Sequence, residues 1–273
     1  MQMFKYYEVK LPCGEFTANL ECYVNNFGGH RPAMLVIPGG GYACVCAERE
    51  GNLIAEAFLA RGFNCFVLTY TVGGGAKFPQ QLTEASLAME YIRNNATELH
   101  VNPERVYCVG FSAGGHLAGS LGTMWHKIDM NGINRPNGMV LCYPVLTATE
   151  GVCHEGSFLN LLDKETLTPE DRETYAIEKN IDSRTCPAFL MHTADDAVVP
   201  VESTIYAAAA LSREKIPFEV HIYPHAPHGV ALGTELSSRE NPNSTPNPEW
   251  VDEAIAQWVD HAVYFLNKLP DNS

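Results

Sequence analysis

The chain has 273 residues, a length that suits one large domain, and 46% of them are hydrophobic, which is enough for a sizeable core. Its formal net charge of −14 argues against nucleic acid as a partner, because the phosphates would be repelled. The same charge offers no basic patch to an anionic membrane, and no apolar run approaches the roughly 20 residues that a membrane-spanning helix needs. We attribute the acidity to solubility.

The N-terminal residues and the cysteines favour a cytoplasmic location. Residues 1–8 contain no apolar segment of the kind that signal peptides carry. The nine cysteines are scattered, and Cys65 and Cys108 lie in apolar, strand-like runs, as reduced core cysteines do. Cys44 and Cys46 are too close together for an ordinary zinc pair and have no second pair nearby. We therefore expect no metal site and no disulfide framework.

Strands and helices are expected to alternate along the chain. Residues 4–9 and 16–24 alternate in polarity, which predicts two antiparallel edge strands. Apolar runs of strand length predict buried strands at 33–37, 64–70, 105–109, 138–144, 186–192 and 218–223. Helical spacing of apolar residues predicts helices at about 48–61, 79–100, 117–125, 201–215 and 250–269. This alternation predicts an α/β fold with one mostly parallel sheet and helices on both faces.

The segment 145–185 interrupts the alternation with polar sequence and short helices between two core strands. We interpret it as an insert that forms a lid or a pocket wall. Because no internal repeat or second core is evident, residues 1–273 are expected to form a single domain.

The sequence Gly110-Phe111-Ser112-Ala113-Gly114 follows the strand 105–109 and precedes a helical run of small and apolar residues. Strand, Gly-x-Ser-x-Gly and helix form the signature of a nucleophile elbow, in which the serine occupies a strained turn. The glycines two residues before and two after the serine allow the strand and the helix to approach closely. The helix N-terminus favours negative charge beside the serine hydroxyl. The motif therefore predicts that Ser112 is a nucleophile.

A serine hydroxyl is a poor nucleophile until a base takes its proton. After an elbow of this type, an acid and a histidine are expected in that order, on loops that follow later strands. Asp196 is the expected acid, from its place just before a Val-Pro pair, and Asp195 is the competing candidate. His228 is the expected base, because the glycine after it allows a tight turn towards the serine, and His225 is the alternative.

The glycine run 39–41 directly follows the strand 33–37. Acyl transfer builds negative charge on a carbonyl oxygen, and losing one N–H donor that stabilises this charge can cost about 3–4 kcal/mol. Glycines allow the backbone to turn such donors into a cavity. We expect the N–H groups of Gly40, Gly41 and Ala113 to form this oxyanion hole. No Gly-Lys-Ser/Thr or Gly-x-Gly-x-x-Gly pattern accompanies the run, which argues against a phosphate loop.

With these motifs, the chain resembles the α/β-hydrolase esterases, and more closely the carbohydrate-esterase-like members described as acetyl xylan or feruloyl esterases. The resemblance covers nearly the whole chain. It rests on Pro38-Gly39-Gly40-Gly41-Tyr42, Arg49-Glu50-Gly51, Pro79-Gln80-Gln81-Leu82 with Glu84-Ala85, Gly110 to Ala118, Asp195-Asp196 before Val199-Pro200, and His228-Gly229. Lipase-like relatives carry a histidine before the three glycines, whereas Pro38 stands there in this chain, which is similar to the subgroup that acts on carbohydrate esters.

The resemblance implies a serine carboxylesterase that hydrolyses small acyl esters, with acetylated xylo-oligosaccharides as a plausible substrate class. The implied mechanism is a Ser-His-Asp acyl-enzyme pathway through Ser112, His228 and Asp196 that needs no metal or organic cofactor. The expected partner is a small-molecule ester, with no nucleic acid and no membrane. We expect Tyr42 and Tyr143, together with parts of the insert, to form the pocket walls.

Three alternatives stay open. The first is an amidase or peptidase on the same fold, such as a formamidase, since these motifs hardly separate ester from amide hydrolysis. The second is a lipase for long acyl chains, which the modest insert and the charged loops disfavour. The third is a binding module without catalysis, which an intact serine, acid and histidine disfavour.

Overall fold

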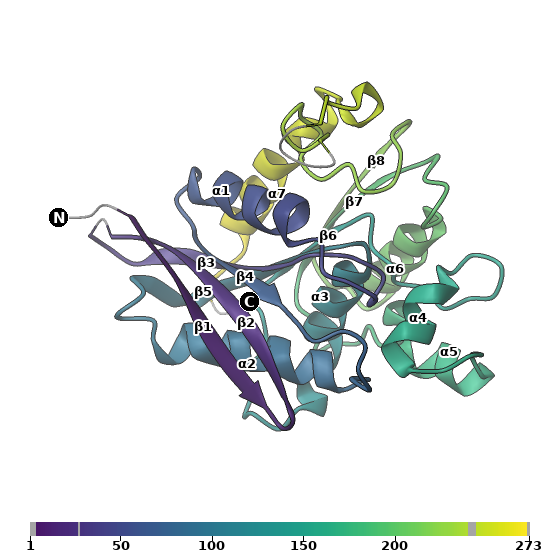
Figure 1. The fold of residues 1–273 in the computed structure, drawn as a ribbon, viewed down its shortest axis with the longest axis horizontal. Helices are drawn as coiled ribbons and strands as arrows, with labels where there is room; N and C mark the ends of the chain where they lie inside the picture. Colours follow the sequence, from purple (N-terminus) through teal and green to yellow (C-terminus); the bar gives the residue numbers. More distant parts are fainter. Residues whose placement is uncertain (1–3, 27, 240–243, 272–273) are drawn as a thin grey trace.

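The computed structural model describes residues 4–26, 28–239 and 244–271. An eight-stranded sheet runs through them in the order β1-β2-β4-β3-β5-β6-β7-β8 (Figure 1). The strands are β1 (Phe4–Cys13), β2 (Phe16–Asn25), β3 (Arg31–Ile37), β4 (Asn64–Thr69), β5 (Val101–Phe111), β6 (Met139–Cys142), β7 (Ala188–Thr193) and β8 (Phe218–Tyr223). Strand β2 is antiparallel to both β1 and β4, and all the other pairs are parallel, which confirms the predicted mostly parallel α/β sheet.

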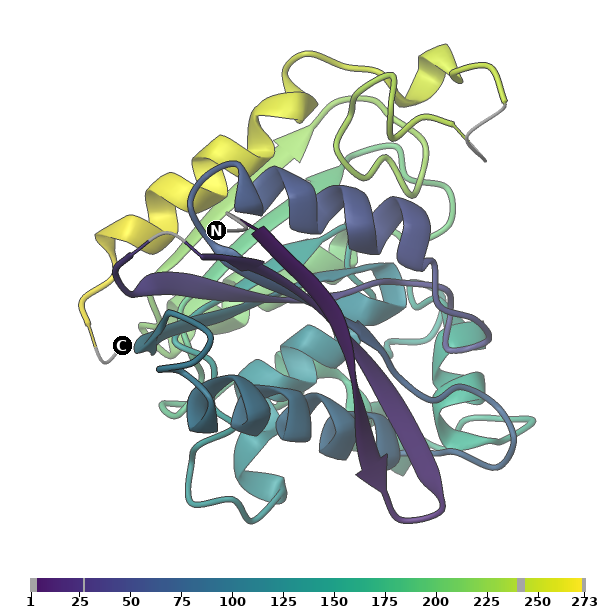
Figure 2. The ribbon, with the colours of Figure 1, turned by 60° about the vertical axis from the view of Figure 1, so that its left-hand side comes forward.

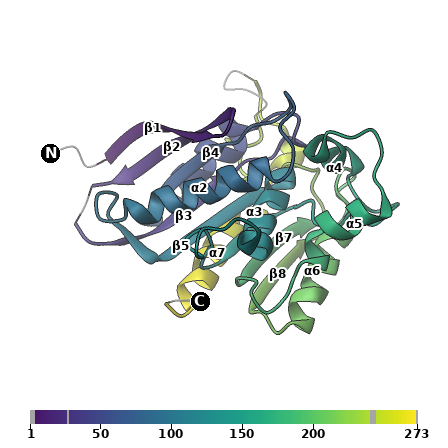
Figure 3. The same cartoon turned by 90° about the horizontal axis from the view of Figure 1, so that it is seen from below.

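Helices cover both faces of the sheet. They are α1 (Leu53–Leu59), α2 (Gln80–Asn94), α3 (Ser112–Met124), α4 (Glu155–Leu162), α5 (Pro169–Tyr175), α6 (Glu202–Arg213) and α7 (Trp258–Lys268). Short turns of other helix types are η1 (Glu48–Asn52), η2 (Trp125–Lys127), η3 (Ile177–Lys179), η4 (Pro248–Trp250) and η5 (Ile255–Gln257). Helices α1 and α7 lie on one face, and α2, α3 and α6 lie on the other (Figures 2 and 3). Among the helices of the described residues, none combines the length and the apolar character that crossing a membrane requires.

Strand β3 shows why the buried strands are continuous apolar runs. Its alternate residues Ala33, Leu35 and Ile37 pack into the core under α2 and α3, whereas Met34 and Val36 pack into the core under α1 and α7. All five are fully buried, so both faces of the strand require apolar side chains.

Several predicted boundaries are wrong, for local reasons. Of the two N-terminal strands predicted as edge strands, β1 lies at an edge of the sheet, whereas β2 lies between β1 and β4. Helix α2 ends at Asn94, and Asn95 then donates two hydrogen bonds to the Tyr91 carbonyl from its N–H and its Nδ2. The last helix begins at Trp258, not at 250, because Asp252 accepts hydrogen bonds from two following N–H groups and holds a tight turn before the helix.

The segment 145–185 forms α4, α5 and η3, beside the carboxyl ends of the strands (Figure 3). Both ends of the segment are attached to the sheet domain. The Ser203 hydroxyl on α6 accepts the N–H groups of Leu146 and Thr147, and His116 on α3 bonds to the carbonyl of Tyr175. The segment is thus packed onto the domain, and its role as a lid stays a prediction.

The order of the strands makes two neighbouring loops diverge at one edge of the sheet. Strand β3 lies between β4 and β5, so the chain passes from one side of β3 to the other after β4. Loops after β3 and β5 therefore diverge at the carboxyl edge, and open α/β sheets bind their ligands at such a point. The glycine run 39–41, Ser112, Asp196 and His228 follow β3, β5, β7 and β8 at this edge.

Candidate active site

Ser112 occupies the sharp turn between β5 and α3. Its φ of 52° lies in the left-handed region, which is strained for a residue with a side chain. A Cβ atom at Gly110 would lie 2.2 Å from the Gly114 carbonyl oxygen, and one at Gly114 would lie 2.2 Å from the Ile37 carbonyl oxygen. Both positions therefore require glycine, and the strained elbow predicted from the motif is present.

The structure brings Ser112, His228 and Asp196 into one hydrogen-bonded line. Ser112 Oγ lies 2.9 Å from His228 Nε2, and His228 Nδ1 lies 2.7 Å from Asp196 Oδ2. Because a carboxylate only accepts, the His228 proton sits on Nδ1, and Nε2 is left to accept the serine proton. This is the arrangement in which an acid orients a base against a nucleophile.

The Asp196 carboxylate is held by more than His228. Its Oδ1 accepts the N–H groups of Val198 and Val199, each at 2.9 Å, and His192 Nε2 lies 3.4 Å from its Oδ2. Burial raises the pKa of Asp196, but hydrogen bonds from His192 and His228 outweigh burial, so the pKa lies below its usual value. Asp196 therefore remains a carboxylate that can stabilise a positive charge on His228.

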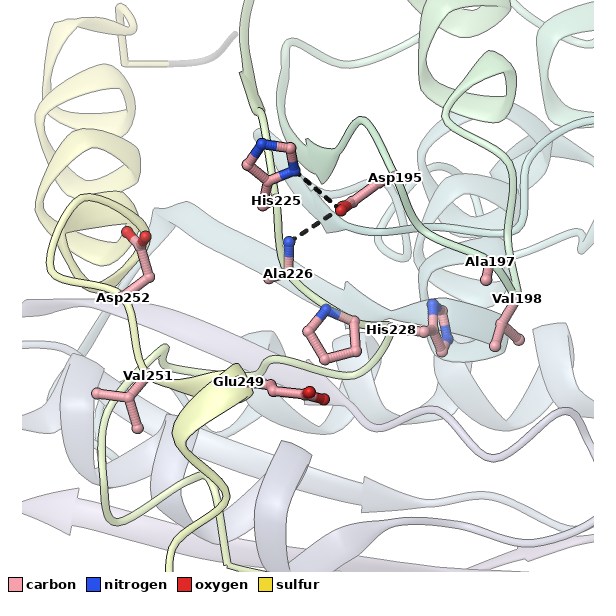
Figure 4. Close-up of a pocket in the computed structure, with 10 residues that line it drawn as sticks. Asp195, Ala197, Val198, His225, Ala226, His228, Glu249, Val251 and Asp252 are labelled. Carbon is pink, nitrogen blue, oxygen red and sulfur yellow. Dashed lines mark hydrogen bonds and ion pairs between the residues drawn. The ribbon is translucent and has the colours of Figure 1, made fainter.

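The competing candidates, Asp195 and His225, form a separate pair at the surface. Asp195 Oδ2 lies 3.0 Å from His225 Nδ1, and Asp195 Oδ1 accepts the Ala226 N–H at 3.1 Å (Figure 4). The two side chains are 51% and 83% exposed, whereas those of Asp196 and His228 are 0% and 16% exposed. Asp195 thus bonds to His225 and to the Ala226 N–H, and neither Asp195 nor His225 contacts Ser112.

The loop after β3 presents backbone N–H groups beside the elbow. Within the described residues, the N–H groups of Gly40 and Gly41 donate no hydrogen bond. The Ala113 N–H lies in the first turn of α3, where no carbonyl of the helix can accept it. A Cβ atom on Gly39 would lie 3.0 Å from Ser112 Cβ, so the loop packs directly against Ser112. Gly40, Gly41 and Ala113 remain our prediction for the oxyanion hole.

The structure corrects the prediction that Tyr42 and Tyr143 line the pocket. They are only 2% and 1% exposed, and neither ring face is free for a substrate. Both residues have positive φ angles, of 58° and 35°, and both side chains pack into the core. The Tyr42 hydroxyl bonds to His116 Nδ1 at 2.8 Å, and the Tyr143 ring packs edge-on against His228 with centroids 5.1 Å apart.

A cleft that the sequence analysis missed opens beside His228 (Figure 4). It has a volume of about 560 Å³ and is lined by Asp195, Ala197, Val198, His225, Ala226, Pro227, His228, Glu249, Val251 and Asp252. Glu249 and Asp252 belong to no motif, so no sequence pattern selects them.

Helix α4 of the insert contacts the glycine run 39–41. Asn160 Nδ2 donates to the Gly41 carbonyl at 2.8 Å, and Ser157 Oγ would lie 4.0 Å from a Cβ atom on Gly41. His154, just before α4, bonds to Ser157 Oγ at 2.8 Å. Burial, and after it the charge of His228, lower the pKa of His154.

Cys44 and Cys46, the closely spaced cysteines of the sequence, lie next to the glycine run 39–41. Cys44 is exposed, and its thiol donates to the Gly40 carbonyl at 3.6 Å. Burial raises the pKa of Cys46 to about 11. All nine cysteines are free thiols. Across the described ranges, no three His, Cys, Asp or Glu side chains gather closely enough to hold a metal ion.

Two family models match the chain. The BD-FAE model matches residues 20–139, which include the glycine run and Ser112. The prolyl oligopeptidase family model matches residues 80–241, which include Ser112, Asp196 and His228. Together the two models cover the elements that carry the site.

Two curated relatives are similar in sequence. The endo-1,4-beta-xylanase B of Butyrivibrio fibrisolvens is 38% identical over 229 residues, which are 81% of this chain and 36% of that protein. The acetylxylan esterase of Xylanibacter ruminicola is 30% identical over 220 residues, which are 80% of this chain and 44% of that protein. The chain therefore spans less than half the length of these curated relatives.

A solved structure is similar over its whole length. It is MGS-M1, described as an α/β-hydrolase enzyme from a Medee basin deep-sea metagenome library, with 32% identity and a TM-score of 0.78. The match covers 98% of this chain and 99% of that one. The chain belongs to the α/β-hydrolase family, in its group of acetyl xylan esterase-like esterases.

Proposed function

We propose that the chain is a serine carboxylesterase that removes small acyl groups, acetyl above all, from a hydroxyl-rich alcohol such as an acetylated xylo-oligosaccharide. The observation that carries the proposal is the line of Ser112, His228 and Asp196, with contacts of 2.9 Å and 2.7 Å. The acetylxylan esterase and xylanase among the relatives support the carbohydrate part.

The first half-reaction forms an acyl-enzyme. His228 Nε2 takes the proton of Ser112 as Oγ attacks the ester carbonyl, and the carbonyl oxygen becomes negatively charged. The N–H groups of Gly40, Gly41 and Ala113 stabilise this oxyanion. When the tetrahedral intermediate collapses, the ester C–O bond breaks, and the alkoxide leaves with the proton that His228 returns.

The second half-reaction repeats these steps with water. His228 takes a proton from water, the hydroxide oxygen attacks the acyl carbon, and the same donors hold the oxyanion. Ser112 Oγ then leaves and regains the proton from His228, and the carboxylic acid is released. Asp196 stays ionised throughout and stabilises the imidazolium of His228.

The lining of the cleft beside His228 supports the proposal that the leaving alcohol is rich in hydroxyl groups. The leaving alcohol must lie near His228, which protonates it, and His228 lines the cleft. Carboxylates accept hydrogen bonds from sugar hydroxyls, and Glu249, Asp252 and Asp195 line the same cleft. In Figure 4 the Glu249 carboxylate extends towards His228, and Asp252 lies farther from it. We propose that Glu249 is the principal acceptor for the alcohol.

We propose that the insert forms one wall of the substrate site, next to the glycine run 39–41. This is supported by the contacts of Asn160 and Ser157 of α4 with Gly41. The nine free thiols support a reducing compartment such as the cytoplasm, where the substrate would be a small, soluble ester.

Hydrolysis of a substrate panel tests the proposal. The panel holds p-nitrophenyl acetate, acetylated xylobiose, acetylated monosaccharides, feruloyl esters and a p-nitrophenyl series of longer acyl chains. We expect cleavage of the acetates, a preference for acetylated xylobiose over p-nitrophenyl acetate, and falling rates beyond about eight acyl carbons. Ser112→Ala should abolish cleavage and covalent labelling by a fluorophosphonate. Hydrolysis that survives in Ser112→Ala, or an absence of esterase activity in the wild type, would overturn the proposal.

A second candidate is amide hydrolysis, which the match to the prolyl oligopeptidase family model favours. A p-nitroanilide matched to p-nitrophenyl acetate, together with formylkynurenine, separates the two functions. If kcat/KM for either amide exceeds that for the ester, the amidase assignment replaces the esterase assignment.

A further inference from the structure

Glu50 is a buried carboxylate beside the site that the proposed mechanism does not use. It is 3% exposed and lies in η1, a π-helical turn that leads into α1. Its Oε2 accepts the Gly39 N–H at 2.8 Å, and its Oε1 accepts the Tyr143 hydroxyl at 2.9 Å. Burying a carboxylate is unfavourable unless both oxygens are hydrogen-bonded, and here each oxygen has its own donor.

We propose that Glu50 is a positioning residue that joins the glycine run 39–41 after β3, here called the oxyanion loop, to residues 224–231 after β8, here called the histidine loop. One carboxylate would thus align both halves of the catalytic site. The inference rests on the proposed esterase function and names a residue that this function needs in addition to Ser112, His228 and Asp196.

The first half of the argument concerns the oxyanion loop. A Cβ atom on Gly39 would lie 2.7 Å from Glu50 Oε2 and 2.7 Å from the Phe111 carbonyl oxygen. Gly39 is therefore held between Glu50 and the strand end that carries Ser112. Because Glu50 accepts the Gly39 N–H, the orientation of this peptide is set, and with it the direction of the N–H groups of Gly40 and Gly41.

The second half concerns the histidine loop. The Tyr143 hydroxyl accepts the Ala231 N–H at 3.1 Å, and its ring packs edge-on against His228. Burial, followed by the charge of Glu50, raises the pKa of Tyr143 well above its ordinary value, so its hydroxyl keeps its proton. That proton needs an acceptor, and Glu50 Oε1 supplies it.

Glu50 also lies against the residue that follows the base. A Cβ atom on Gly229 would lie 3.9 Å from Glu50 Oε1 and 3.0 Å from Arg49 Nη2. The Arg49 guanidinium stacks 4.4 Å above the Trp250 ring, which fixes its place over this loop. The turn that aims His228 at Ser112 is thus packed on the Arg49-Glu50 pair.

Two donors converge on Glu50, so the side chain at this position must accept twice. A glutamine has a single carbonyl oxygen, so it can accept either the Gly39 N–H or the Tyr143 hydroxyl proton. Its amide NH2 group, which only donates, would then face the other donor. Glu50→Gln therefore releases one of the two loops while it conserves volume. A misplacement of about 1 Å in a catalytic group can lower the rate by about 100-fold.

The experiment measures kcat and KM for p-nitrophenyl acetate in Glu50→Gln, Tyr143→Phe, the double variant and a matched control, Glu84→Gln. Glu84 is also a fully buried carboxylate, and it accepts hydrogen bonds from Thr71 and Gln80, outside the site. Melting temperatures of all variants separate lost stability from lost alignment.

We expect Glu50→Gln to lower kcat by about 10- to 100-fold with KM changed less than about threefold. Tyr143→Phe should also lower kcat, and the double variant should lose about as much as Glu50→Gln alone, because both changes break one bridge. Glu84→Gln should keep its kcat even if its melting temperature falls.

The proposal is overturned if Glu50→Gln keeps the kcat of Glu84→Gln, or if the losses of the two single variants multiply in the double variant. If Glu50→Gln does not fold, Tyr143→Phe decides, and a wild-type kcat in that variant overturns the proposal. A wild type without esterase activity would instead refute the proposed function and is recognised before any variant is compared.

Discussion

Asp195 and Asp196 are neighbours in the chain, yet their carboxylates contact two different histidines. Asp196 Oδ2 lies 2.7 Å from His228 Nδ1 in the interior, and Asp195 Oδ2 lies 3.0 Å from His225 Nδ1 at the surface. Asp195 and Asp196 therefore each contact a histidine Nδ1 with similar geometry, and only the Asp196 pair adjoins Ser112.

This relationship gives a prediction with an internal control. Asp196→Asn removes the acceptor that keeps the His228 proton on Nδ1, and we expect kcat for p-nitrophenyl acetate to fall by roughly 10³- to 10⁴-fold. Asp195→Asn changes an exposed ion pair and should leave kcat within about threefold of the wild type. Equal losses in the two variants would contradict the assignment of Asp196 as the acid.

The elbow glycines give a prediction about stability. A Cβ atom at Gly114 would meet the carbonyl oxygens of Ile37 and Pro38 at 2.2 Å and 2.3 Å. We expect Gly114→Ala to destabilise the fold by about 3 kcal/mol, seen as a melting temperature lower by roughly 6–12 °C. Gly156→Ala is the matched control, since its nearest atom would be His154 Cε1 at 3.8 Å, and it should melt at or slightly above the wild-type temperature. A Gly114→Ala melting temperature equal to that of the control would refute the steric argument.

His116 gives a prediction about pH. Burial lowers its pKa to about 4, although the hydrogen bond to the Tyr175 carbonyl opposes this. In the unfolded chain the pKa is near 6.5, so between about pH 6.5 and pH 4 the unfolded state binds more protons, and stability falls as the pH falls. The full loss amounts to about 3 kcal/mol, and above pH 6.5 it is absent.

The measurement is the free energy of unfolding in urea at pH 7 and at pH 4.5. We expect the wild type to lose about 2 kcal/mol more than His116→Gln between these two values. His225→Gln, which changes a histidine that is 83% exposed, should follow the wild type. If His116→Gln loses as much stability as the wild type, His116 is not the group responsible.

The cleft gives a prediction about substrate selection. If Glu249 accepts sugar hydroxyls, Glu249→Gln should raise KM for acetylated xylobiose by roughly threefold to tenfold. KM for p-nitrophenyl acetate should not change, because that alcohol has no hydroxyl to donate. Glu253→Gln is the control, since Glu253 is an exposed neighbour that does not line the cleft. An unchanged KM for the sugar ester would show that the alcohol does not bind in this cleft.

The parts of the molecule that could be predicted from sequence are those that depend on neighbouring residues. The elbow around Ser112 is recognisable because the steric need for Gly110 and Gly114 lies within five residues. The core strands are recognisable because burial on both faces leaves only apolar side chains in each run.

The parts that could not be predicted depend on contacts between distant segments. Tyr42 turns inward to His116, which is 74 residues away, and Tyr143 turns inward to Glu50, which is 93 residues away. An aromatic residue next to a catalytic motif has the same local sequence whether it faces substrate or core. The sequence favours Asp196 over Asp195 from its place before Val199-Pro200, but the pairing of Asp195 with His225 depends on how the folded loop directs the two carboxylates.

The distance along the chain between Ser112 and His228 has a consequence for refolding. These residues meet across 116 positions, and strands β6 and β7 lie between the strands that carry them. Parallel strands pair only after their crossover segments have formed, so non-local pairings of this kind form slowly. During refolding we therefore expect the helical circular dichroism signal to return first, and turnover of an acetyl ester to return only when β8 has docked against β7. The rate at which activity returns would then report the rate of the last step in the assembly of the sheet.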